Sequence, residues 1–152
     1  MEGKAVNHWQ RALDCHAAHA ACFAAHQAAL LDRDLAAADR LLTTYEADLL
    51  SHMAVEERGV LPLYRDRGGE RPGGTVDLFL REHDKLRTAL RHLRQCLAGL
   101  SPAPAAIIDL LDRECAYKNL MAHHDLRERN MLYPWLAEHA TAAEAEALVA
   151  QL

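Results

Sequence analysis

Apolar residues recur every three or four positions over four long segments of this chain, which is the spacing of one face of an α-helix. Ala and Leu dominate these segments, whereas aromatic and β-branched residues are sparse, and this balance favours helix over sheet. We therefore predict an all-α protein. Its four long helices are expected to run from about Ala5 to Leu31, Leu35 to Tyr64, Val76 to Leu100, and from a Ser101-Pro102 start signal to about Glu138.

Short polar connections separate the predicted helices. Asp32-Arg33-Asp34 is typical of a tight turn with an Asp N-cap, and the Gly-rich stretch 67–74 is the one clear loop. Thr141 and Glu144 have the spacing of a capping box that begins a short last helix, expected to reach Leu152. Long helices joined in this way predict an up-down-up-down four-helix bundle with a short C-terminal fifth helix. At 152 residues, we expect one domain over residues 1–152.

A motif of charged and polar residues occurs twice on the apolar stripes. His52 precedes Glu56 by four residues and His124 precedes Glu128 by four, and a Pro follows each Glu by six. Four residues make about one helical turn, so each imidazole lies over its carboxylate on one face. A charged Glu in a bundle core is costly unless it is paired or binds a metal. The repeat therefore indicates a metal site.

Two further histidines lie at a similar height. His16 is 17 residues before the turn at Arg33 and His52 is 19 after it, while His83 is 18 before the turn at Ser101 and His124 is 23 after it. At about 1.5 Å per residue, the mismatches in height are on the order of 3 to 8 Å, which side chains can absorb. Such a set of imidazoles and carboxylates suits two transition metals, with iron first and zinc or manganese as alternatives. The predicted metal ligands are His16, His52, Glu56, His83, His124 and Glu128.

The alternative is a buried hydrogen-bond network without metal, which would need a partner for every lone pair. His19 is either a fifth histidine ligand or a partly buried bundle residue. Glu114, also on a core stripe, is expected to pair with Arg91 or Arg94, or to line the rim of a water channel. Several other residues are expected at the surface or boundary. For one of them, Glu82, the alternative is a contact with the ligand histidines. The full set at the surface or boundary is His8, His26, Glu57, Glu82, His92, His123 and His139.

Charge and cysteine content narrow the function classes. A formal charge of −5 with scattered Lys and Arg argues against nucleic acid as a partner. No apolar run approaches the roughly 20 residues of a membrane span, and the N-terminus lacks a signal-peptide pattern, so we expect a cytoplasmic protein. None of the four cysteines forms a CxxC pair, and we expect small buried hydrophobes rather than disulfides.

The order of these motifs resembles the hemerythrin-like (HHE cation-binding) family over roughly residues 10 to 138. The shared pattern is a lone His, an HxxxE, a second lone His and a second HxxxE, with Val60-Leu61-Pro62 and Met131-Leu132-Tyr133-Pro134 after the two Glu. The resemblance implies a non-haem pair of iron ions bridged by the two Glu and an oxo or hydroxo group. It assigns His16 and His52 to one iron, and His83 and His124 to the other.

One residue departs from the oxygen-carrying members of the family. They have a second His four residues after the one on the third helix, where this chain has Arg87. An iron with one ligand fewer favours reactivity or sensing over simple oxygen carriage. We expect a protein that binds or senses O2 or NO. The alternatives are a di-iron oxidoreductase acting on peroxide, O2 or NO, and a protein for iron handling or iron-centre repair.

Overall fold

The computed structural model describes residues 7–152, and within them it is helical with no β-strand. The predicted all-α class is confirmed. The elements are α1 (Gln10–Leu31), α2 (Leu35–Val55), η1 (Glu56–Val60), α3 (Leu61–Asp66), α4 (Val76–Ala98), α5 (Pro104–Arg127), η2 (Glu128–Leu132), α6 (Tyr133–His139) and α7 (Ala142–Val149). Among these residues, no helix combines the length and the apolar character that a membrane crossing requires.

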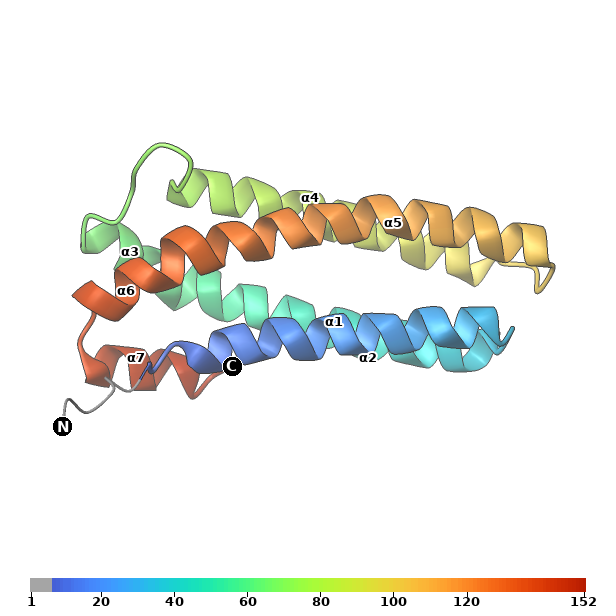
Figure 1. Ribbon diagram of the computed structural model, residues 1–152, viewed down its shortest axis with the longest axis horizontal. Coiled ribbons are helices and arrows are strands. Elements are labelled where there is room, and N and C mark those ends of the chain that lie inside the picture. The colour runs from blue at the N-terminus through green and yellow to red at the C-terminus, as the bar shows by residue number, and fades with distance from the viewer. Residues whose placement is uncertain (1–6) are drawn as a thin grey trace.

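The four long helices lie along the long axis of the molecule (Figure 1). α1 packs against α2 and α4 against α5, and contacts of α2 with α4 and of α1 with α5 join the two pairs. The short helices α3, α6 and α7 gather at one end, near the start of α1 (Figure 1). This end contains the residues that follow each HxxxE motif.

The predicted turn signals are largely confirmed. The Asp34 carboxylate accepts the Ala37 N–H at the start of α2, and Arg33 adopts a left-handed φ of 58° just before it. The capping box of Thr141 and Glu144 is formed in full at the start of α7. Local side-chain to backbone hydrogen bonds can be predicted from sequence because they need only neighbouring residues.

Several predicted helix ends differ from those in the structure. α1 begins at Gln10, because the Asn7 side chain accepts the Trp9 N–H and Trp9 becomes the N-cap; the predicted start at Ala5 lies outside the described residues. Ser101 does not cap α5: its Oγ accepts the Ala103 N–H at 3.2 Å, which closes a turn ahead of a helix that begins at Pro104. At their C-terminal ends, α4 and α7 stop at Ala98 and Val149, a few residues earlier than expected.

A π-helical turn follows each HxxxE motif, which the sequence did not predict. In η1 the Leu61 N–H bonds to the Glu56 carbonyl, and in η2 the Tyr133 N–H bonds to the Glu128 carbonyl, each five residues back. A proline, Pro62 or Pro134, stands two positions after the last residue of each turn. Proline has no N–H and its ring clashes with the carbonyl four residues back, so a wider turn relieves the clash. The predicted disturbance near Pro134 thus lies before the proline.

The apolar core has two parts. One cluster fills the half of the molecule around Leu42, Leu90 and Leu110, and the other fills the end around Trp9 and Tyr64. Along α1, α2, α4 and α5, the predicted metal ligands lie between residues of the first cluster and residues of the second. The polar residues are therefore enclosed by apolar packing on both sides.

Candidate metal centre

All four long helices bring predicted ligands to the same level. His16 lies on α1, His52 near the end of α2, His83 on α4 and His124 near the end of α5. The two glutamates, Glu56 and Glu128, are the first residues of η1 and η2. Each of the six side chains is at most 5% exposed. The structure thus brings together all six residues that the sequence singled out.

The six side chains form two groups that share both glutamates. One group is His16, His52, Glu56 and Glu128, and the other is Glu56, His83, His124 and Glu128; in each, the potential ligand atoms lie within 4.8 Å of one another. This is the same division that the family resemblance assigned to two irons.

Each glutamate presents one oxygen to each group. Glu56 Oε1 is 2.9 Å from His52 Nε2, and Glu56 Oε2 is 3.3 Å from His83 Nε2. Glu128 Oε1 is 2.9 Å from His124 Nε2, and Glu128 Oε2 is 3.0 Å from His16 Nε2. Two carboxylates in this arrangement can bridge two cations, and all four Nε2 atoms face inward.

The donor set fits a metal pair. Glu56 Oε2, His83 Nε2 and both oxygens of Glu128 are buried without a hydrogen-bond partner among residues 7–152. Buried polar atoms in proteins are normally partnered, so this concentration of unsatisfied polar atoms at one point indicates a place for a ligand. Imidazole and carboxylate are ligands that iron, zinc and manganese accept.

The electrostatics of the centre also indicate a cation. Burial disfavours charge, yet nearby carboxylates outweigh it and raise the pKa of His83 to about 9 and of His124 to about 11. Burial and Glu128 both raise the pKa of Glu56, but the histidines outweigh them and lower it to about 2. Without metal, the carboxylates thus hold protons on His83 and His124. Metal binding would replace these protons with a metal charge.

A carboxylate holds the outer nitrogen of each histidine in the second group. Glu57 Oε1 is 2.9 Å from His83 Nδ1 and also accepts Arg87 Nη2 at 2.6 Å. Glu57 is still 27% exposed, so it lies at the boundary of the protein, but its carboxylate contacts His83 rather than facing solvent alone. Arg87, where oxygen carriers of the family have a histidine, supports a ligand histidine through Glu57 instead.

Glu82 does the same for His124. Its Oε2 is 3.0 Å from His124 Nδ1, and its Oε1 accepts Arg127 Nε at 2.8 Å. Glu82 is 7% exposed, so the contact with a ligand histidine, predicted as an alternative, is the arrangement found. Burial raises the pKa of Glu82, but the hydrogen bonds from His124 and Arg127 outweigh it and keep that pKa below its usual value.

Tyr133 also belongs to the centre, although the sequence indicated it only as part of the Met131-Leu132-Tyr133-Pro134 signature. It is buried, and its hydroxyl donates to Glu56 Oε1 at 2.5 Å. Burial and the nearby carboxylates raise the pKa of Tyr133 well above its ordinary value, so the phenol keeps its proton. Its place directly before Pro134 in the second signature was the signal that could have identified it.

Two cavities adjoin the first group of ligands. A mainly apolar cavity of about 380 Å³ extends between α1 and α5 from Gln27 and Lys118 to His16 and Asp125. A second, of about 300 Å³, is lined by His52 and His19, among others. His83 and His124 line neither cavity.

His19 belongs to neither ligand group. Its ring packs edge-on against His52, with ring centroids 5.3 Å apart. Burial and the neighbouring histidines lower the pKa of His19 to about 4. Of the two alternatives for His19, the structure therefore shows the partly buried residue.

Glu114 is not paired with Arg91 or Arg94. Its Oε1 lies 2.6 Å from Nε2 of His26, and its Oε2 accepts from Gln27 at 2.9 Å. His26 is fully buried, so its predicted surface or boundary position is wrong. These partners come from helix α1, far from Glu114 in sequence.

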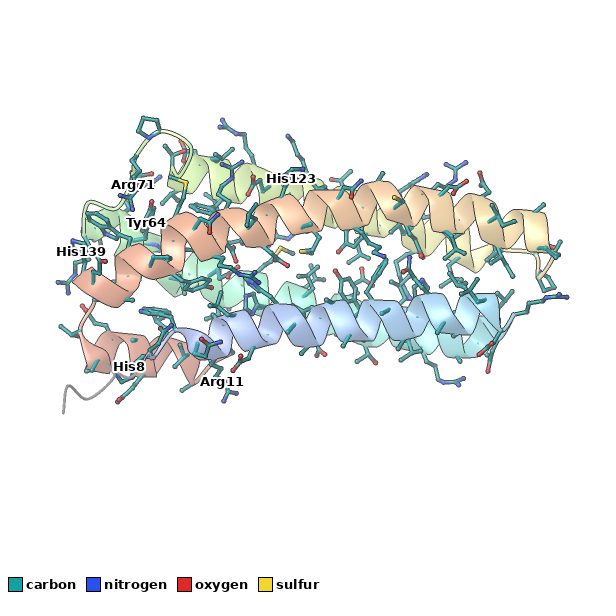
Figure 2. The ribbon with its side chains drawn as sticks, in the orientation of Figure 1. His8, Arg11, Tyr64, Arg71, His123 and His139 are labelled. Atoms are coloured by element: carbon teal, nitrogen blue, oxygen red, sulfur yellow. The ribbon has the colours of Figure 1, made fainter. Side chains whose placement is uncertain are left out.

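Three other histidines that were predicted at the surface or boundary lie there. His123 is exposed on α5, and His8 and His139 lie at the end that holds α6 and α7 (Figure 2). All four cysteines are free, as expected, but none is buried: Cys115 is exposed and the others are half-buried. The expectation of buried cysteines is wrong because their positions flank the core stripes.

A comparison with protein families identifies the chain. The model of the hemerythrin HHE cation binding domain matches residues 11–136 and also residues 74–152. The chain belongs to the hemerythrin HHE cation-binding family. Two overlapping matches on this hemerythrin domain agree with its repeated motif, since residues 74–152 hold the second lone His and the second HxxxE. No curated protein and no solved structure gives a significant match.

Proposed function

We propose that this hemerythrin-family chain is a non-haem di-iron protein that binds or senses a small diatomic ligand, O2 or NO. The observation that carries the proposal is the pair of ligand groups sharing Glu56 and Glu128, with buried oxygens that have no other partner. The proposal includes an up-down-up-down four-helix bundle as the scaffold, with α7 as a short fifth helix.

In this proposal, His16 and His52 hold one iron and His83 and His124 hold the other. Glu56 and Glu128 bridge the two positions. A bound iron pair supplies redox chemistry and open coordination positions for a small ligand. The residues of the chain supply the rest: they fix the two positions, exclude bulk water by apolar packing on both sides and keep a protonated phenol, Tyr133, next to Glu56.

Two features support a reactive or sensing role. Each group offers two imidazoles and two carboxylates, which leaves room for an exogenous ligand. The apolar cavity that reaches His16 gives a small neutral molecule a path from the surface between α1 and α5. An apolar path suits O2 and NO better than it suits charged compounds.

A second candidate is a di-iron oxidoreductase acting on peroxide, O2 or NO. The Tyr133 hydroxyl favours it, because this buried group keeps a hydrogen-bond donor 2.5 Å from Glu56 Oε1, and a donor held beside the centre can stabilise negative charge that develops on an oxygen species. The chemistry that distinguishes the two candidates is turnover, not binding.

The test is an absorption spectrum of the iron-loaded protein after addition of O2, NO or peroxide, together with metal analysis. A stable, reversible adduct supports binding or sensing, whereas sustained consumption of peroxide or NO supports the oxidoreductase. If the protein holds iron but no ligand changes its spectrum, both candidates fail and iron handling or a structural metal remains.

A further inference from the structure

The two ligand groups are supported unequally. Each histidine of the second group has its outer nitrogen within hydrogen-bond distance of a carboxylate: Glu57 for His83 and Glu82 for His124. Such partners fix the tautomer and orientation of a ligand histidine and increase its basicity. Arginines hold both carboxylates in place, at 2.6 and 2.8 Å.

The first group lacks this support. The Nδ1 atoms of His16 and His52 are both buried without a hydrogen-bond partner among residues 7–152. The carboxylate facing His16 is Asp125, whose Oδ1 is 3.7 Å away, too far for a hydrogen bond. The ring of His52 instead packs edge-on against His16 and His19.

The carboxylate oxygens are unequal as well. Glu56 Oε1, on the side of His52, already accepts a hydrogen bond from Tyr133 at 2.5 Å. Glu56 Oε2, on the side of His83, has no such partner. A hydrogen-bond donor competes with a cation for the electron pairs of the same oxygen, so the Tyr133 contact weakens Oε1 as a ligand for the first position.

The His16/His52 position is also more accessible than the His83/His124 position. His16 lines the cavity of about 380 Å³ and His52 lines the one of about 300 Å³, whereas the second pair lines neither. A chelator or a recipient of metal therefore meets the first position before it meets the second.

The inference that follows rests on the proposed function. We propose that the His83/His124 position is a retained metal site and that the His16/His52 position is an exchangeable one. The chain then holds one cation firmly and releases the other to a competitor. Glu57 and Glu82 act as positioning residues for the retained site.

The test uses the full chain loaded with Fe2+ without oxygen, followed by a ferrous chelator in excess while the absorbance of the chelate is recorded. We expect one iron per chain to leave quickly and one at least about tenfold more slowly, the scale of outer-contact effects on metal affinity. Release of both irons in a single phase would overturn the inference. A wild-type chain that binds no iron would instead contradict the proposed function.

Variants assign the two phases to their positions. His16→Ala should leave one iron that departs slowly, and His124→Ala one that departs quickly; the reverse assignment would overturn the inference. Glu82→Gln should accelerate the slow phase by about 10- to 100-fold. Asp125→Asn is the matched control on the other side, and we expect it to leave the slow phase unchanged because Asp125 makes no hydrogen bond to a ligand histidine. Circular dichroism confirms that each variant folds, and the wild-type phases test the inference independently.

Discussion

Two regions of this molecule bury histidine together with glutamate, and they differ in how their polar atoms are satisfied. Between α1 and α5, His26 Nδ1 meets the Ala38 carbonyl at 2.8 Å, His26 Nε2 meets Glu114, and Gln27 donates to the other Glu114 oxygen. At the metal centre, two histidine Nδ1 atoms, one Nε2 and three carboxylate oxygens have no partner among residues 7–152. Burial of His and Glu is common to both regions, so it does not by itself indicate a metal.

The first region needs no metal, because a proton between His26 and Glu114 lets the two side chains satisfy each other. The Ala38 carbonyl can only accept, so His26 Nδ1 donates to it. The 2.6 Å contact between His26 Nε2 and Glu114 then requires one more proton, on either atom. One shared proton, the Ala38 carbonyl and the Gln27 amide complete the His26–Glu114 pair. The candidate metal centre keeps several buried atoms without a partner in the described part of the chain, which teaches that unsatisfied atoms, rather than burial, mark a candidate ligand site.

The largest effect should come from removing a bridging carboxylate. Glu56→Ala or Glu128→Ala should lower the metal content to less than two per chain, because each glutamate serves both ligand groups. Elemental analysis of the purified variants measures this. Full occupancy in both variants would refute the bridging assignment.

Breaking the self-sufficient pair should reduce stability without reducing metal content. Glu114→Ala should cost about 3 to 5 kcal/mol in the free energy of unfolding, the usual effect of removing one partner of a buried pair. Chemical denaturation measures the loss. The matched control is the double variant His26→Phe/Glu114→Leu, which replaces the pair by apolar groups and should recover most of the stability. A double variant as unstable as the single one would contradict this account.

Metal removal should affect only the other region. At a free metal concentration about 100 times Kd, each bound metal contributes about 2.7 kcal/mol, so a chelator should lower the free energy of unfolding by that amount per site. The same loss is expected in the His26→Phe/Glu114→Leu variant. If that variant lost its response to chelator, the two regions would not be independent.

The smallest effect concerns Tyr133. Tyr133→Phe removes the hydrogen bond to Glu56 Oε1 and should cost about 1 kcal/mol of stability in the metal-free protein. Thermal unfolding of the metal-free variant measures it. An increase in stability would mean that the hydroxyl is strained rather than satisfied there.

Local geometry explains why the sequence could predict part of the His/Glu cluster that the structure brings together. His52 with Glu56, and His124 with Glu128, are one helical turn apart, so their shared face follows from helix periodicity. The helical class followed from composition, and the Thr141 capping box from neighbouring residues.

Contacts between helices could not be predicted in the same way. His26 and Glu114 are 88 residues apart, and nothing in either segment names its partner. Glu57 and Glu82 lie at the edges of core stripes, where periodicity does not distinguish a residue that faces solvent from one that reaches a neighbouring helix. The π-helical turns also escaped prediction, because a proline in a helix is equally compatible with a kink or an end.

Each wide turn accommodates one extra residue, while the residues after it keep roughly the direction that a regular helix would give them. Each contains one residue more than a regular helix would use between its glutamate and the following proline. Deleting a single residue between 57 and 60 would replace the wide turn by a regular helical turn, so Leu61 and Tyr64 would keep roughly the same angle about the helix axis and still face the apolar end of the molecule. The deletion would instead remove the wider turn that relieves the clash of the Pro62 ring, so its cost would fall on the backbone hydrogen bonds beside Glu56.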